Sequence, residues 1–283
     1  MSETKDAFEF LSKCWVPVIA SEHGIYYPFG NTRMLDFLRD FKVSREMNIL
    51  VLGLGDVRHV MATVAGLSQR PPSSFGEVKK IHFHLNDVDQ DVIARDIILL
   101  EIINKLNPES KSDVEFLWSV WYNAFMLEKD FTRLKTFLGE LIDKYSNSSR
   151  ENERICNFGD KQSLKSVLKT WNLWLNRKLS QPAIKQSRLK SLESEVKTQS
   201  LSDSVIAQYA SMQVYIDRGI KESDVEAVGK EMLTYLRDGF VNFSEDRKDR
   251  NVFVNPTLMR PGCDEWLVEE TAFAAACYLP FQK

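Results

Sequence analysis

The residues best suited to hold a small molecule form a short turn, in which Gly53 and Gly55 flank Leu54 and Asp56 follows. Glycine lets a ligand approach the backbone closely and permits dihedral angles that are closed to other residues. Unpaired N–H groups at the start of the next helix favour a polar or anionic ligand group. The turn follows an apolar strand and opens a periodic helix, so the pattern predicts a ligand-binding loop. The alternative is a plain strand-to-helix turn without a ligand.

Three acids further along the chain extend this predicted site. Asp87 ends the second predicted strand, where it is placed to accept both hydroxyls of a ribose. Asp89 is either a further cofactor contact or, as we favour, the cap of the helix that begins near Val92. Asp160 ends a third predicted strand and could face an adenine amino group. Its alternative role is to cap the helix from Gln162.

The pattern of glycines bears on which cofactor the turn would hold. The third glycine of the strict dinucleotide fingerprint is replaced by Arg58, which argues against NAD because a pyrophosphate needs the tighter helix approach. S-adenosylmethionine has no phosphate and uses a looser turn. We therefore expect S-adenosylmethionine as the cofactor, an adenosyl small molecule held at this edge of the sheet.

The elements that would position these residues alternate between strand and helix. Apolar runs predict strands over 47–52 and 80–85, the first of them buried on both faces, and a third strand over 154–158. Helical periodicity predicts helices over 57–67 and 92–106. This order predicts an α/β fold, a Rossmann-like (methyltransferase-like) mostly parallel sheet with helical insertions.

The chain divides into four predicted parts. Residues 1–45 form an N-terminal helical and aromatic segment packed on the core, which includes a helix over 34–41. Residues 46–175 form the Rossmann-like core, with a helical insertion near 108–150 made of helices over 116–127 and 131–145. Residues 176–250 form a helical excursion, and residues 251–283 supply a C-terminal strand and tail that complete the core.

Other candidate residues carry weaker signals. Asn255 and Pro256 follow the last predicted strand, as in amino-group methyltransferases where such a turn accepts the protons of the substrate amine. An ordinary turn is the alternative, because Asn-Pro is a common turn dipeptide. Tyr27 and Asn31, in a turn-rich aromatic segment, are further candidates for the acceptor site.

No catalytic triad is evident in the sequence, and the dispersed cysteines predict reduced thiols. His82 and His84 would share one face of a strand, where they are ordinary satisfied imidazoles or, as the alternative, a pair of metal ligands.

Composition excludes several classes of protein. The net charge of −3 lacks the basic balance of a nucleic-acid-binding domain. No apolar run approaches the roughly 18 residues that span a bilayer. The first six residues are polar and acidic, unlike a signal peptide, so we expect a cytoplasmic protein that binds neither membrane nor nucleic acid.

Several segments carry a family resemblance, strongest over residues 26–125. These are Tyr27–Thr32, Leu50–His59, Asn86–Asp89, Val92–Arg95, Phe116–Asn123, Ser163–Trp171 and Tyr215–Gly219. They resemble the domain numbered 4470 among domains of unknown function, found in fungal and animal proteins with MYND zinc fingers and in axonemal dynein assembly factor 3. The resemblance implies a methyltransferase-like fold and no established reaction. This chain lacks the MYND cysteine pattern.

Three functions follow as expectations, and the third is a different nucleotide-linked enzyme that uses the same sheet edge. In the first, the chain transfers a methyl group from S-adenosylmethionine to an unknown acceptor. Gly53, Gly55 and Asp56 would hold the methionine end, Asp87 the ribose, and the inserted helices the acceptor, with catalysis by proximity and alignment. In the second, the chain is a non-catalytic scaffold resembling dynein arm preassembly factors. Its helical insertion would then bind protein partners.

Overall fold

A computed structural model describes residues 34–41, 45–69, 80–177, 239 and 252–259. Several sequence predictions lie outside these residues. They are the candidate positions Tyr27 and Asn31, most of the N-terminal segment over 1–45, and nearly all of the excursion over 176–250. The C-terminal tail beyond residue 259 also lies outside them.

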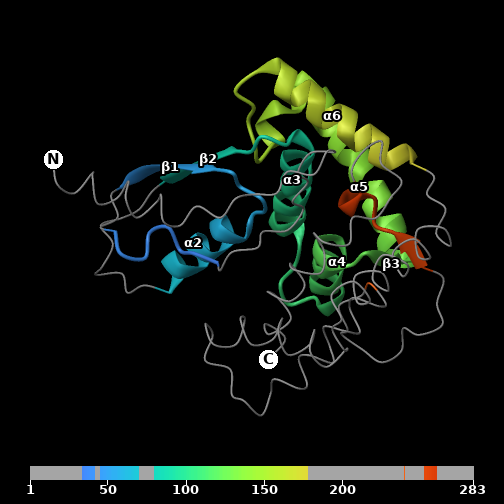
Figure 1. Cartoon of the computed structure of the whole chain (residues 1–283), viewed down its shortest axis with the longest axis horizontal. Coiled ribbons are helices and arrows are strands. Elements are labelled where there is room, and N and C mark those ends of the chain that lie inside the picture. The colour runs from blue at the N-terminus through green and yellow to red at the C-terminus, as the bar shows by residue number, and fades with distance from the viewer. Residues whose placement is uncertain (1–33, 42–44, 70–79, 178–238, 240–251, 260–283) are drawn as a thin grey trace, which may run out of the picture.

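Two parallel strands form the smaller part of the described fold. Strand β1 (Glu46–Leu52) pairs in parallel with β2 (Lys80–Asn86) along its whole length. Helix α2 (Arg58–Ser68) follows the glycine turn and lies along one face of the pair (Figure 1). The predicted order of strand, glycine turn, helix and strand is confirmed.

The prediction that the first strand is buried on both faces is wrong. Ile49 and Val51 on one face pack with Val60 of α2, whereas Leu50 and Leu52 on the other face are 64% and 70% exposed. Successive side chains of a strand point to opposite faces, and among the described residues α2 covers one of these faces. A continuous apolar run predicts a strand buried on both faces, but a strand that is covered on one face can also consist of apolar residues.

Four helices form the larger part of the fold. They are α3 (Gln90–Lys105), α4 (Lys111–Tyr122), α5 (Glu128–Ser146) and α6 (Lys161–Asn176). Helix α3 lies between the parallel strands and the other three helices, and it packs on α4 and α6 (Figure 1).

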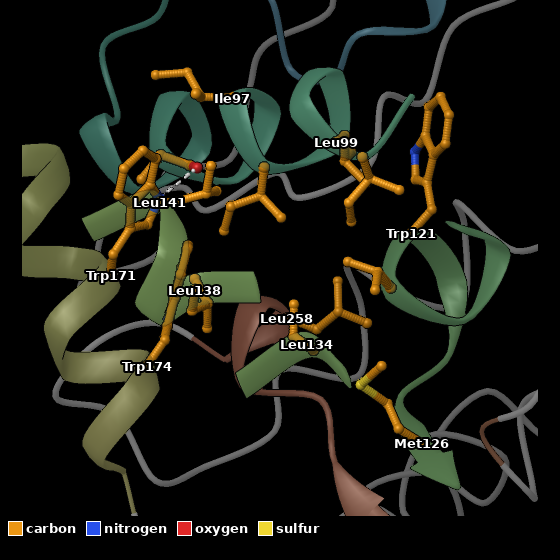
Figure 2. Packing of buried hydrophobic residues seen from close by; sticks show 14 of the residues in the cluster. Ile97, Leu99, Trp121, Met126, Leu134, Leu138, Leu141, Trp171, Trp174 and Leu258 are labelled. Carbon is orange, nitrogen blue, oxygen red and sulfur yellow. Dashed lines mark hydrogen bonds between the residues drawn. The ribbon is translucent and has the colours of Figure 1, made fainter. Parts of the chain in front are cut away.

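The core runs through the contacts of these helices. Two tryptophans of α6 are fully buried (Figure 2). Both indole N–H groups are satisfied, because Trp171 donates to the carbonyl of Ala94 at 2.9 Å and Trp174 to that of Met259 at 3.2 Å. Leu134 and Leu138 of α5 are also completely buried in this cluster. The residues predicted as a helical insertion thus supply much of the core.

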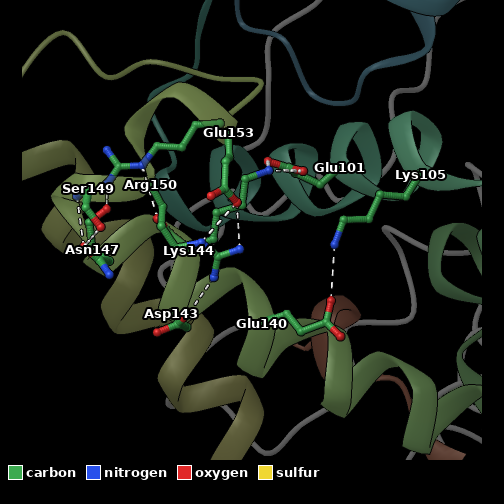
Figure 3. A network of polar contacts seen from close by, with 10 residues as sticks. Glu101, Lys105, Glu140, Asp143, Lys144, Asn147, Ser149, Arg150 and Glu153 are labelled. Atoms are coloured by element: carbon green, nitrogen blue, oxygen red, sulfur yellow. Dashed lines mark hydrogen bonds and ion pairs between the residues drawn. The ribbon is translucent and has the colours of Figure 1, made fainter.

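A buried ion pair fastens α3 to α5 inside this apolar cluster. The Nζ of Lys144 donates to both carboxylate oxygens of Glu101, at 2.8 and 2.9 Å (Figure 3). The hydroxyl of Tyr145 donates to the same carboxylate at 2.7 Å. Since Glu101 is fully buried, these donors replace the water that its charge would otherwise need.

The predicted helix over 116–127 is wrong at both ends. Helix α4 begins earlier, because the side chain of Ser110 accepts from the backbone N–H of Asp113 as an N-cap. It ends at Tyr122, and β3 (Phe125–Leu127) pairs in antiparallel fashion with β4 (Val252–Val254). Helical spacing cannot reveal a strand whose partner lies more than a hundred residues away.

The third predicted strand, over 154–158, is also wrong. A 3₁₀ segment, η2 (Ser148–Glu153), comes first. Residues 154–158 follow it as an irregular stretch without the hydrogen bonds of a strand. The Arg154 guanidinium donates to the carbonyls of Tyr145 and Asn147 near the end of α5, at 2.9 and 3.0 Å. Cys156 and Phe158 pack against the helical core, which accounts for the alternating apolar pattern.

The short helix predicted over 34–41 is replaced by turns. The side chain of Asp36 accepts from the backbone N–H of Leu38 at 2.8 Å. Local bonds of this kind compete with helical hydrogen bonds, so an aspartate near the start of a short segment favours a turn.

The described part of the fold is a mixture of helices and strands, with one short parallel pair of strands. The described residues hold two two-stranded sheets, β1–β2 and β3–β4. Within the same residues, none of the helices combines the length and the apolar character that crossing a bilayer would require.

Candidate functional site

The glycine turn begins where the first parallel strand ends. Gly53 and Gly55 both have φ of +64°, a backbone conformation that side chains with a Cβ rarely adopt. Between them, the backbone N–H of Leu54 donates to the carbonyl of Asn86 at 3.1 Å and continues the pairing with β2. The two glycines are therefore required by the turn itself, and Gly53 is exposed at its surface.

Asp87 is directed at this turn. Its Oδ2 accepts from the backbone N–H of Gly55 at 3.1 Å, and its Oδ1 accepts from the backbone N–H of Asp89 at 3.0 Å. The carboxyl ends of parallel strands meet at one sheet edge, which is why residues 32 positions apart in the chain come together. The structure brings these predicted site residues, Gly55 and Asp87, into direct contact.

Asp89 caps helix α3. Its Oδ1 accepts from the backbone N–H of Asp91 at 2.8 Å, the geometry expected of an N-cap. Of the two roles the sequence left open for Asp89, the capping role is the one observed.

Asp56 is buried beneath the turn with Arg58. The Asp56 Oδ1 lies 3.2 Å from both the backbone N and the Nε of Arg58, and both side chains are almost inaccessible to solvent. The arginine that replaces the third fingerprint glycine thus balances the charge of the acid beside it. Asp56 supports the turn from inside.

His59 is a neighbour of the turn that sequence patterns did not single out. Its Nδ1 accepts from the backbone N–H of Leu35 at 3.1 Å, and its ring lies 5.5 Å from that of Phe37. Partial burial, and secondarily the charge of Arg58, lower the pKa of His59, so the neutral imidazole is favoured. Neutral His59 ties residues 34–41 to the start of α2.

Asp96 is the second residue that sequence patterns missed. It lies on α3 beside Arg95 and is only 2% exposed, yet neither carboxyl oxygen has a hydrogen-bond partner. Burial raises its pKa well above the usual range, and the negative charges of Asp56 and Asp87 raise it further against the opposing effect of Arg95. In the sequence, the one sign of this site was an acid within the largely apolar run Ile93–Ile98.

Asp160 is the N-cap of α6. Its two carboxylate oxygens accept from the backbone N–H and the hydroxyl of Ser163, at 2.8 and 2.7 Å. These bonds lower the pKa of the exposed Asp160 carboxyl. The capping role is again the one observed.

Asn255 and Pro256 form a buried turn after β4, where η5 (Pro256–Leu258) begins. The Asn255 amide nitrogen donates to the carbonyls of Val120 and Asn123 at 3.0 Å, and its oxygen accepts from the backbone and hydroxyl of Thr257. The amide therefore joins the end of α4 to the turn, which is a structural role.

Histidine and cysteine side chains were considered as possible metal ligands. His84 lies near Asn48 on the neighbouring strand, with Nε2 3.2 Å from the amide oxygen. Among the described residues no three acid, histidine or cysteine side chains are grouped as metal ligands. Burial raises the pKa of the Cys156 thiol to about 12.

Comparisons with known proteins bear on the same region. Neither the curated proteins nor the solved structures contain a match to this chain. A family match, in contrast, begins before the described residues and runs through the glycine turn, Asp87 and Asp96 to the middle of β3. Residues 28–126 match the family described as "Domain of unknown function (DUF4470)", which supports the family resemblance predicted from the sequence.

Proposed function

We propose that this protein binds S-adenosylmethionine at the carboxyl edge of β1 and β2 and belongs to the methyltransferase-like, Rossmann-like proteins. One observation carries the proposal: the Asp87 carboxylate is held against the glycine turn by the 3.1 Å bond from Gly55. A glycine turn and an acid at adjacent strand ends form the arrangement that holds an adenosyl ribose in nucleotide-binding sheets.

The carboxylate keeps capacity for a ligand. An ionised carboxylate offers about four lone-pair directions, and the two observed backbone bonds engage one on each oxygen. The remaining direction on each oxygen suits the two neighbouring hydroxyls of a ribose. Asp87 is half-buried, so the ligand could reach it from solvent.

The turn also suits a ligand without phosphate. A Cβ built on Gly53 would have no heavy atom within 4 Å, so the space beside this backbone is open. A phosphate at the same place would need the backbone N–H groups of the turn as donors, and that of Gly55 already donates to Asp87. This favours S-adenosylmethionine over ATP or NAD, and transfer of its methyl group to an acceptor would be the reaction.

Isothermal titration calorimetry with S-adenosylmethionine and S-adenosylhomocysteine tests the proposal. We expect saturable binding of both, and weaker or no binding of ATP and NAD. Asp87→Asn keeps an oxygen for Gly55 but removes the charge, so affinity should fall by about tenfold or more. Asp113→Asn, which changes an acid at the start of α4, is the matched control and should bind like the wild type.

Absence of heat with both adenosyl compounds would overturn the proposal. That outcome would favour the alternative, a non-catalytic scaffold that binds protein partners. Thermal melting of each variant, compared with that of the wild type, separates loss of a ligand contact from loss of the fold.

A further inference from the structure

Asp96 has an unusual environment for a carboxyl group in a protein interior. Both oxygens are buried without a hydrogen-bond partner, although a buried polar group left in this way destabilises the folded state. Most buried polar atoms in folded proteins are satisfied, and an exception requires an explanation. A ligand that supplies the missing partner is one such explanation.

The position of Asp96 connects it with the candidate site. The charges of Asp56, below the glycine turn, and of Asp87, on it, are both close enough to act on Asp96. Asp96 is also close enough to Cys156, in the segment that follows η2, for a charge on Asp96 to act on that thiol. Asp96 therefore lies between the carboxyl edge of the parallel strands and the helical core.

The groups around Asp96 favour its neutral form. Asp56 pairs with Arg58, and Arg95 directs its guanidinium at the carbonyls of Val120 and Trp121. Neither carboxyl oxygen of Asp96 accepts a hydrogen bond from these arginines, and the negative charges of Asp56 and Asp87 oppose its ionisation. In the absence of ligand the protonated acid is favoured, whereas an arriving cation would replace that proton.

We propose that Asp96 is the carboxylate that receives a cationic group of the bound ligand, and that binding releases its proton. This inference rests on the proposed function and specifies it: the ligand carries both a ribose and a positive charge. S-adenosylmethionine offers two cationic groups, the sulfonium and the α-ammonium. Either would give the buried carboxylate the counter-charge that it lacks.

Three compounds distinguish the two sources of charge. S-adenosylmethionine carries both cationic groups, S-adenosylhomocysteine only the ammonium, and methylthioadenosine neither. Calorimetric titration of the wild type and of Asp96→Asn with all three compares affinities. Asparagine keeps the size of the side chain and replaces a neutral acid with a neutral amide, so we expect the variant to fold.

If Asp96 contacts the ammonium, Asp96→Asn should weaken both charged compounds by about tenfold or more and leave methylthioadenosine within about twofold. If it contacts the sulfonium, only S-adenosylmethionine should weaken. Titration of the wild type in buffers of different ionisation enthalpy gives a second readout that needs no variant. We expect release of a proton with the charged compound that Asp96 contacts, and no release with methylthioadenosine.

Two results would overturn the inference in distinguishable ways. If Asp96→Asn binds all three compounds like the wild type, and no proton is released, the Asp96 assignment fails while the proposed function stands. If the wild type binds none of the three, the proposed function fails and the assignment fails with it.

Discussion

The backbone N–H of Gly55 lies 3.1 Å from Oδ2 of Asp87, so the acid that ends the second parallel strand holds the turn that ends the first. Helix α2, strand β2 and a segment outside the described residues separate the two positions along the chain. The bond forms because parallel pairing brings both strand ends to one edge. The shape of the turn and the placement of the acid therefore depend on each other.

Gly53 should resist replacement by alanine for reasons of backbone conformation alone. Its φ of +64° disfavours any Cβ, while the surrounding space is open. We expect Gly53→Ala to lower the free energy of unfolding by about 1–2 kcal/mol. Urea denaturation followed by circular dichroism measures this change.

Gly139, inside α5, supplies the matched control for Gly53. A Cβ there also meets nothing within 4 Å, but the residue is helical. Gly139→Ala should raise the free energy of unfolding by about 0.5–1 kcal/mol. Equal effects of the two alanine substitutions would contradict the conformational argument for Gly53.

Lys144 should be far more important for stability than an exposed lysine. Lys144→Met removes the cation that neutralises the fully buried Glu101 carboxylate. Breaking a buried pair in this way costs about 3–5 kcal/mol, because the remaining charge is left uncompensated. Equilibrium unfolding in urea measures the loss.

A double variant tests whether charge imbalance is the cause. Glu101→Gln combined with Lys144→Met removes both charges and should recover part of the stability lost in Lys144→Met alone. Lys105→Met is the control, because Lys105 forms an exposed pair with Glu140 and should change stability by less than about 1 kcal/mol. Additive losses in the double variant would contradict the pairing argument.

Local sequence signals predicted the strands and helices around the candidate site. The apolar run before Gly53, the periodic helix after it and Asp87 after the next run each carry their information within a few residues. Asp89 and Asp160 were recognised as capping candidates for the same reason. The sequence therefore located both strands of the parallel pair.

Features that depend on distant contacts could not be predicted in this way. β3 exists because Phe125–Leu127 meets Val252–Val254, and helical periodicity contains no trace of that partner. The stretch after η2 resembles a strand, but Arg154 binds it to the end of α5. Likewise, Asp96 becomes a candidate only after packing buries it close to Asp56 and Asp87.

Cys156 should react slowly with alkylating reagents in the folded protein. Burial raises the pKa of its thiol to about 12, with a further contribution from the Glu101 charge, and the thiolate is the reactive form. Relative to a thiol with an ordinary pKa of about 8.5, the thiolate population at pH 8 falls on the order of a thousandfold. Iodoacetamide labelling with peptide mass spectrometry follows Cys156 separately from the other cysteines.

The control for Cys156 is the same labelling reaction in concentrated urea. Unfolding removes the burial that raises the pKa, so the peptide should label rapidly there. Comparable native and denatured labelling rates would show that the thiol is not protected by the helical core.

Asp160 should give α6 a stability that depends on acid pH. Its pKa is lowered by the two bonds from Ser163, so the stabilisation is present above the ordinary aspartate pKa of about 3.9. It is lost as the pH falls through the lower, folded-state value. We expect Asp160→Ala to melt at a lower temperature than the wild type at pH 7, and the difference in melting temperature to narrow as the pH falls below about 4.

The control is Asp160→Asn, because asparagine also caps helices but has no titrating group, so its cap should be retained at every pH. A difference between Asp160→Ala and the wild type that stays constant with pH would assign the effect of alanine to helix propensity or packing and would remove the role of the ionised cap.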